Sequence, residues 1–226
     1  MGPVIDTWDG TPPVGERLVV VAPHPDDEIL AAGGLLRWWS STGRQAVVVA
    51  VTDGEASHSR SSIIGADELR RRRGRERREA LDALCPRRPV VTRLRHSDQG
   101  CAASISQLVG DLRRVLTDDD VVVGPALEDR HPDHVAVAMA LRDVVAVDGG
   151  VLWEAPTWAL VHGSAPPADA VLTFGPDTWE RKKRAMAAYR SQLVALGPDR
   201  ADGPVVHPHE LRQMLRPCEQ FRRIAS

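Results

Sequence analysis

The chain has 226 residues, 42% of them apolar and 27% charged, and a formal net charge of −2. This composition excludes a disordered chain, and the small net charge gives no overall attraction to nucleic acid or to an acidic membrane surface. No stretch of the sequence approaches the ~20 apolar residues that a membrane span needs. A chain of this length can bury a core without disulfides or a structural metal, so we expect one domain over residues 1–226.

The cysteines and the N-terminal residues bear on the cellular compartment. Cys85, Cys101 and Cys218 are widely spaced and odd in number, which favours a reducing compartment over a disulfide framework. Residues 1–16, MGPVIDTWDGTPPVGE, lack the basic start and apolar centre of a secretory signal, and we expect them to form a loose lead-in. These features predict a cytoplasmic protein. The sequence does not indicate an oligomeric state.

Short apolar runs alternate with helical patterns through the first two thirds of the chain. The runs are continuous and rich in β-branched residues, which is typical of strands buried on both faces of a parallel sheet. We predict such strands at Leu18–Ala22, Ala46–Thr52, Pro89–Leu94 and Val121–Gly124. Apolar residues at helical spacing predict helices at Glu28–Ser41, Asp67–Leu84, Ser104–Leu116 and Val135–Val147.

The last third of the chain is less regular. Val151–Leu160 and Ala170–Phe174 are candidates for two further strands, Trp179–Leu193 has the pattern of a helix, and we expect a short final helix near Glu210–Leu215. Alternation of strand and helix implies right-handed βαβ units. The predicted fold class is therefore α/β, with a Rossmann-like, mostly parallel sheet and helices on both faces.

Two clusters of charged residues follow predicted strands. Residues 22–28 read A-P-H-P-D-D-E, directly after the first strand, and residues 128–134 read E-D-R-H-P-D-H, a few residues after the fourth. In an open α/β sheet, ligands bind outside the carboxyl ends of the strands. We therefore expect both clusters to face one crevice.

The residue types in these clusters suit a catalytic metal. Pro132 fits the first position of a helix, so His131 and His134, three residues apart, should share one helix face. Two histidines and one carboxylate with an open position for water are a common arrangement around catalytic zinc, and a spare carboxylate can act as the base. Either cluster alone is equally consistent with a turn or with a negatively charged first helical turn. Their occurrence after two strands of one sheet favours the metal site.

These motifs resemble the PIG-L/LmbE-like family of metal-dependent de-N-acetylases. The resemblance rests on H-P-D-D-E at 24–28 with the Gly33-Gly34 pair after it, and on H-P-D-H at 131–134. Supporting similarities are T-D-G-E at 52–55, R-x-x-E at 73–76, S-D-Q-G at 97–100 and S-Q at 191–192. The resemblance covers about residues 18–193 and implies the LmbE-like form of the predicted fold.

The resemblance also implies a metal centre. Carried over by position, the family's metal ligands fall on His24, Asp27 and His134. The implied cofactor is Zn²⁺, although two histidines and one carboxylate suit Fe²⁺ as well.

Four further residues match catalytic or binding residues of the family. Asp26 matches the general base, and His131 matches the residue that stabilises the oxyanion. Asp133 would orient His131 through a hydrogen bond, as a carboxylate commonly does for a catalytic imidazole. Arg73 matches an arginine that contacts substrate. The leaving amine could take its proton from Asp26 or from His131.

The implied reaction is hydrolysis of an N-acetyl group on an amino sugar or its conjugate, with release of acetate. The expected partner is a small-molecule amino sugar, and the composition suits a high-GC bacterium in which such enzymes often serve thiol or antibiotic biosynthesis. One alternative is an amidase that acts on another N-acyl or thiol-conjugate substrate. An alternative of another class is a metal- or RNA-binding protein without turnover. The near-neutral net charge argues against RNA.

The arginine-rich run at residues 69–78 has two interpretations. It could be a phosphate or nucleic-acid patch. Acidic residues lie inside and around the run and no aromatic residues interleave with it, which favours the solvated face of a helix. We therefore expect every arginine of the run except Arg73 to be solvated.

Other polar and aromatic residues receive ordinary structural interpretations. His58 and His96 are expected to lie outside the ligand set. Trp153 and Trp158 could stack on a sugar ring, although core packing is the more common role of tryptophan. No G-x-G-x-x-G motif occurs, which excludes a dinucleotide site at Gly33-Gly34.

Overall fold

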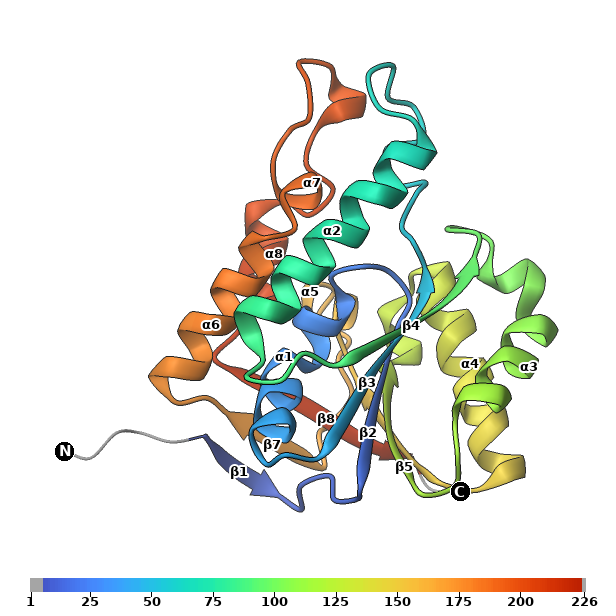
Figure 1. Ribbon diagram of the computed structural model, residues 1–226, viewed down its shortest axis with the longest axis vertical. Helices are drawn as coiled ribbons and strands as arrows, with labels where there is room; N and C mark the ends of the chain where they lie inside the picture. The colour runs from blue at the N-terminus through green and yellow to red at the C-terminus, as the bar shows by residue number, and fades with distance from the viewer. Residues whose placement is uncertain (1–5, 225–226) are drawn as a thin grey trace.

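A computed structural model describes residues 6–224 and contains one eight-stranded sheet in the order β1-β7-β8-β6-β5-β2-β3-β4 (Figure 1). The strands are β1 Thr7–Gly10, β2 Arg17–Ala22, β3 Gln45–Thr52, β4 Val90–His96, β5 Asp120–Pro125, β6 Val151–Ala155, β7 Ala170–Thr173 and β8 Cys218–Ile224. The helices are α1 Asp27–Ser41, α2 Ala66–Leu84, α3 Ile105–Val115, α4 Pro132–Asp148, α5 Trp158–Val161, α6 Pro176–Ala187, α7 Arg190–Leu193 and α8 Pro208–Met214.

Five neighbouring strands, β4-β3-β2-β5-β6, run parallel. They confirm the predicted α/β sheet, and their spatial order places the first of them along the chain, β2, in the middle. The direction of winding reverses between β2 and β5, which are hydrogen-bonded neighbours. Such a reversal opens a crevice at the carboxyl ends of the two strands, where ligands bind in this class of fold.

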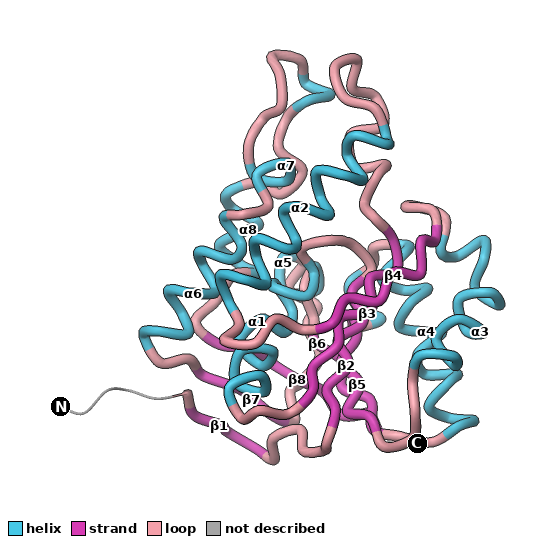
Figure 2. The backbone as a smooth tube through the Cα atoms, viewed as in Figure 1, coloured by secondary structure: helices cyan, strands magenta, loops and turns pink. Residues whose placement is uncertain are grey.

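The central strands bury side chains on both faces because helices cover both sides of the sheet (Figure 2). Leu18 and Val20 of β2 pack with apolar residues of α1, α2 and α6, whereas Val19 and Val21 pack with α3 and α4. This alternation explains why the strands appear in the sequence as continuous apolar runs. Within residues 6–224, no helix combines the length and the apolar character that a membrane crossing requires.

The N-terminal segment differs from the predicted loose lead-in. Its residues Thr7–Gly10 form β1, which pairs antiparallel with β7 at the edge of the sheet. Edge pairing is available to a short strand without apolar alternation because the backbone supplies the hydrogen bonds. Residues 1–5 of the predicted lead-in and residues 225–226 lie outside the described residues.

The last third contains predicted elements that end early and one that the prediction missed. Strand β6 ends at Ala155, and residues 158–161 form the short helix α5 instead of continuing the strand. The helix predicted to end at Leu193 is divided into α6 and α7. Strand β8 was not predicted, and it pairs antiparallel with both β6 and β7. Glu219 and Arg222 obscure the strand pattern because they form buried and half-buried ion pairs.

Helix α2 carries the arginine run. Arg71, Arg75 and Arg78 are exposed, as predicted. The expectation that only Arg73 would be removed from solvent is wrong for Arg77, because Arg77 is 3% exposed. It lies one helical turn before the fully buried Leu81, on the side of α2 that packs towards the sheet.

A buried ion pair joins α1, α6 and β8. Helix α1 departs from helical geometry at Ala32, and the carboxylate of Glu219 on β8 accepts hydrogen bonds from the backbone N–H groups of Gly34 and Leu35 at 2.7 and 3.0 Å. The ammonium of Lys182 donates to Glu219 and to the carbonyl oxygen of Leu30. Gly34 is required here because a Cβ would lie 2.1 Å from the ring of Phe174.

Lys182→Met should lower the free energy of unfolding by about 3–5 kcal/mol, because it leaves the Glu219 carboxylate buried without a counter-charge. Urea unfolding at neutral pH would measure the loss. The double variant Lys182→Met/Glu219→Gln should recover part of it, because the amide oxygen can still accept from the backbone. Equal stability of Lys182→Met and the parent chain would contradict a structural role for the pair.

Candidate active site

The two charged clusters meet at the crevice between β2 and β5. The first leads from β2 into α1, and the second leads from β5 into α4. The ring centroid of His24 lies 4.8 Å from that of His131 and 5.4 Å from that of His134, and the two rings of the second cluster are 5.2 Å apart. The structure therefore brings together histidines that are more than a hundred residues apart in the chain.

The three predicted metal ligands converge on one carboxylate oxygen. Oδ2 of Asp27 lies 3.3 Å from Nδ1 of His24 and 3.2 Å from Nε2 of His134. The Nε2 atom of His134 is buried and has no hydrogen-bond partner among the described residues. Nitrogens of His24, His131 and His134 also lie within 4.8 Å of one another, as do ligand atoms of His24, Asp98 and Asp133. Imidazole nitrogens and carboxylate oxygens clustered in this way fit a divalent cation of the zinc type.

The electrostatics of the ligand set agree with a cation site. Burial disfavours the protonated ring of His134, but Asp27 and Asp129 outweigh burial and raise its pKa to about 9. For Asp27, burial acts in the opposite direction to the two histidines, and the net effect lowers its pKa well below the usual value. A divalent cation would bind the carboxylate of Asp27 and displace a proton from His134.

In each histidine of the predicted ligand set, the ring nitrogen that does not face Asp27 contacts another carboxylate. Nδ1 of His134 donates to Oδ2 of Asp129 at 2.8 Å. Nε2 of His24 lies 3.1 Å from Oδ2 of Asp133 and 3.3 Å from Oδ1 of Asp98. A carboxylate on the far nitrogen fixes the tautomer and leaves the other nitrogen free for a metal.

Asp129 is a site residue to which the sequence analysis gave no role. It is 1% exposed, and its other oxygen accepts hydrogen bonds from the backbone N–H groups of Thr157 and Ala159 at 2.9 and 3.0 Å. It therefore connects His134 to the loop after β6 and to the start of α5. The sequence could have indicated this role, because Asp129 lies in the second charged cluster, five residues before His134.

Asp129→Asn should weaken metal binding about 10- to 100-fold, because the amide no longer accepts the His134 proton as a charged partner. Competition with a chromogenic chelator would measure the change. Asp111→Asn is a matched control. Asp111 also lies against a histidine, with 3.1 Å between its Oδ2 and Nε2 of His96, but that histidine is not a proposed metal ligand. Equal metal affinity in Asp129→Asn and the parent chain would contradict the supporting role.

Asp26 lines the same pocket as His24 and Asp27, two of the three predicted ligands. Its backbone has φ 124°, a conformation that favours glycine but that Asp and Asn tolerate better than most residues. Its side chain is almost fully buried, and burial raises its pKa to about 7 although Arg73 opposes the rise. A carboxyl group with a pKa near neutrality can take up and release a proton at working pH.

Arg73 positions the loops around Asp26. The guanidinium donates to the carbonyl oxygens of Gly54 and Pro25, and one of its nitrogens lies 3.5 Å from Oδ2 of Asp26. Arg73 also lines the pocket in front of the ligand set, although it is only 2% exposed. The companion residue of its motif, Glu76, accepts hydrogen bonds from the backbone N–H and the hydroxyl of Ser191, which joins α2 to α7.

His131 caps helix α4. Its Nδ1 accepts a hydrogen bond from the backbone N–H of Asp133 at 3.3 Å. This bond leaves the ring proton on Nε2, the nitrogen that can donate to a ligand. Burial and the neighbouring His24 and His134 lower the pKa of His131 to about 4, so the ring is neutral.

The side chain of Asp133 contacts a different histidine from the one predicted. Its carboxylate lies against His24 and accepts from the backbone N–H groups of Gln99 and Cys101 at 2.7 and 3.1 Å. The expected carboxylate contact with His131 is replaced by the backbone bond described above. The backbone N–H groups of Gln99 and Cys101 hold the carboxylate on the side of the loop after β4, where His24 lies within hydrogen-bond distance.

A pocket of about 150 Å³ opens in front of the ligand set. Its walls include Trp158, Ser57 and Gln192 in addition to the charged residues described above. Trp153 lies in the core, where it is 4% exposed. His58 is buried, and its ring contacts the carbonyl oxygen of Gly203 at 3.2 Å.

The fold and the site together define an α/β protein with a buried His/Asp cluster at the carboxyl edge of its parallel strands. A family profile described as PIG-L, GlcNAc-PI de-N-acetylase, matches residues 19–145. This match covers more than half of the chain, and the chain belongs to that deacetylase family. A search among curated proteins found no match.

Solved structures share the fold at low sequence identity. N,N'-diacetylchitobiose deacetylase from Pyrococcus horikoshii has a TM-score of 0.68 and 20% identity, covering 93% of this chain and 84% of that chain. The zinc-inhibited form of teicoplanin deacetylase Orf2 has a TM-score of 0.67 and 20% identity, covering 82% and 88%. GalB, the 4-carboxy-2-hydroxymuconate hydratase from Pseudomonas putida, has a TM-score of 0.62 and 16% identity, covering 93% and 97%. The fold is therefore shared by proteins with different reactions.

Proposed function

We propose that this protein is a metal-dependent hydrolase that removes the N-acetyl group from an amino sugar or its conjugate and releases acetate. The observation that carries the proposal is the placement of Asp26, buried and with its pKa raised to about 7, beside the convergent His24, Asp27 and His134. A binding protein would need the ligands but would not need an adjacent carboxyl group of this kind.

The proposed metal ligands are His24, Asp27 and His134, and the proposed ion is Zn²⁺, with Fe²⁺ as the alternative for the same donor set. When bound, such an ion acidifies water and polarises the carbonyl oxygen of an amide. Asp129 and Asp133 keep the two rings oriented through their far nitrogens.

Asp26 is the proposed general base. It would take a proton from the water that attacks the acetyl carbon, and Arg73 at 3.5 Å would stabilise its ionised form before attack. The same group then returns the proton to the sugar nitrogen as the C–N bond breaks. Proton transfer by a positioned side chain of this kind contributes about 10²- to 10⁴-fold to a rate.

His131 is the proposed oxyanion donor. Its Nδ1 accepts from the backbone, so its Nε2–H can donate to the oxygen that gains negative charge in the tetrahedral intermediate. A neutral imidazole fixed as a helix cap needs no reorganisation when the charge develops. The lowered pKa also makes His131 a poorer candidate than Asp26 for protonation of the leaving amine.

The pocket supports a small acyl group and a sugar. Its volume of about 150 Å³ is below the roughly 300–1,000 Å³ of pockets that enclose whole drug-sized ligands, so a short acyl group fits better than a long one. Trp158 offers an aromatic face on which a sugar ring could stack. Arg73, which also lines the pocket, is the proposed polar contact to substrate.

The test is an assay of acetate release by protein purified without chelator, with zinc and iron quantified in the same sample. The panel contains N-acetylglucosamine, its inositol, thiol and oligosaccharide conjugates, and matched N-propionyl and N-butanoyl compounds. Acetate release that needs the metal supports the proposal. Preference for the longer acyl groups would move the function to another amidase. Metal binding without turnover of any compound would overturn the deacetylase proposal.

A further inference from the structure

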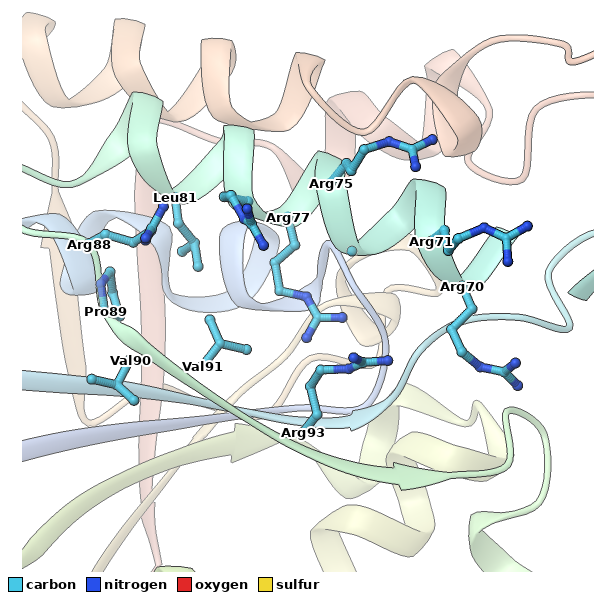
Figure 3. A pocket seen from close by; sticks show the side chains of 12 residues that line it. Arg70, Arg71, Arg75, Arg77, Leu81, Arg88, Pro89, Val90, Val91 and Arg93 are labelled. Atoms are coloured by element: carbon cyan, nitrogen blue, oxygen red, sulfur yellow. The ribbon is translucent and has the colours of Figure 1, made fainter. Parts of the chain in front are cut away.

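A groove between α2 and the edge strand β4 is separate from the candidate active site and is strongly basic (Figure 3). It has a volume of about 740 Å³, seven arginines line it, and none of its lining residues is acidic. Apolar Leu81, Val90 and Val91 form part of its wall. The volume lies within the roughly 300–1,000 Å³ typical of small-molecule sites.

Arg77 is the most buried of these arginines. It is 3% exposed, and its Nε–H has no hydrogen-bond partner among the described residues. Figure 3 shows its guanidinium extending into the groove towards Arg93. The buried carboxyl group of Glu28 is close enough for Arg77 to lower its pKa against the effect of burial, but no hydrogen bond joins the two residues. An anion that occupies the groove would supply the hydrogen-bond partner that this guanidinium lacks.

Several of the other arginines in the groove are already paired with carboxylates. Arg93 makes two hydrogen bonds to Asp53, at 2.8 and 2.6 Å, and Arg88 contacts Asp82 at 3.1 Å. Within residues 6–224, neither Arg77 nor Arg78 forms an ion pair. These two neighbouring residues are therefore the arginines of the groove that have no carboxylate within ion-pair distance, and Glu28 acts on Arg77 only from farther away.

We propose that the groove binds a compact phosphorylated molecule, whose phosphate oxygens accept hydrogen bonds from Arg77 and Arg78. The planar guanidinium fork matches phosphate geometry, and a phosphate monoester carries about −1.5 to −2 charges at neutral pH, which matches two unpaired arginines.

An extended polyanion such as RNA fits the surface less well. Glu68, Glu79 and Asp82 lie on the same helix as the arginines, at its exposed and half-exposed positions. A strand of phosphates that ran along α2 would be repelled by these carboxylates. A compact phosphorylated molecule places its charge at one point and therefore meets fewer of these carboxylates than a strand along the helix would.

The test is calorimetric titration of the full chain with inorganic pyrophosphate at low salt, after removal of metal so that the active-site cluster cannot hold the probe through an ion. We expect saturable binding with about one site per chain. Arg77→Gln and Arg78→Gln should each weaken binding about tenfold or more, because each removes a charge-assisted hydrogen bond. Arg113→Gln, on α3 and paired with Asp148, is the matched control and should bind as the parent chain does.

Three results would overturn the proposal. The first is no saturation of the parent chain by pyrophosphate, and the second is unchanged affinity in Arg78→Gln. Arg78 is exposed, so this second variant decides the matter even if Arg77→Gln fails to fold. The third is tighter binding of a single-stranded RNA or an acidic peptide than of pyrophosphate. The outcome is independent of acetate release, which Arg78→Gln should leave unchanged.

Discussion

Asp26→Asn should reduce kcat for acetate release about 10²- to 10⁴-fold, because the amide can neither take the proton from water nor return it to the leaving nitrogen. Asn keeps the size of the side chain and tolerates the backbone angle of 124° at this position. Since Asp26 is not among the proposed ligands, the variant should purify with as much metal as the parent chain. The measurement pairs kcat with metal content in one preparation.

The neighbouring carboxylate provides the matched control for this prediction. Asp27→Asn alters the oxygen that lies 3.3 and 3.2 Å from the two histidines, and it should therefore lower metal content as well as activity. The two adjacent substitutions separate a base from a ligand. Near-parental turnover by Asp26→Asn would exclude the proposed base, and loss of metal in this variant would assign Asp26 to the ligand set instead.

His134→Ala should abolish metal retention on dialysis and acetate release together. The change removes one of three proposed donors, so the loss of metal affinity should exceed the about 10- to 100-fold expected for an outer carboxylate such as Asp129. Metal content by mass spectrometry and activity after zinc is restored are the two readouts. The variant also leaves Asp129 buried without its ring partner, so circular dichroism should be used to check that the variant is folded.

His209→Ala is the control for the removal of a histidine. His209 is exposed on α8 and does not line the pocket, so metal content and activity should both match those of the parent chain. If His134→Ala retained one metal per chain and full activity, the ligand set would have to be rebuilt around His24 and other carboxylates.

Local patterns in the sequence were sufficient to predict the parallel strands of the sheet. Continuous apolar runs such as Val47–Val51 are buried on both faces, and only strands between two helical layers have that character. The start of α4 could also be predicted, because Pro132 takes the first position of this helix and His131 caps it. Strand β8 could not be predicted from the sequence, because the partners of its charged residues are distant in the chain. An example is Lys182, which pairs with Glu219.

The sequence by itself determined the two charged clusters of the candidate site and the edge of the sheet at which they lie, because strand ends and helix starts are local features. Only the tertiary structure decided which side chains meet. The carboxylate of Asp133 turns to His24 instead of His131, and Asp129 supports His134 while it binds the loop after β6. The burial of Arg77 is likewise a result of tertiary packing. These contacts depend on the packing of segments far apart in the chain, and no spacing in the sequence encodes the direction in which a buried side chain finds its partner.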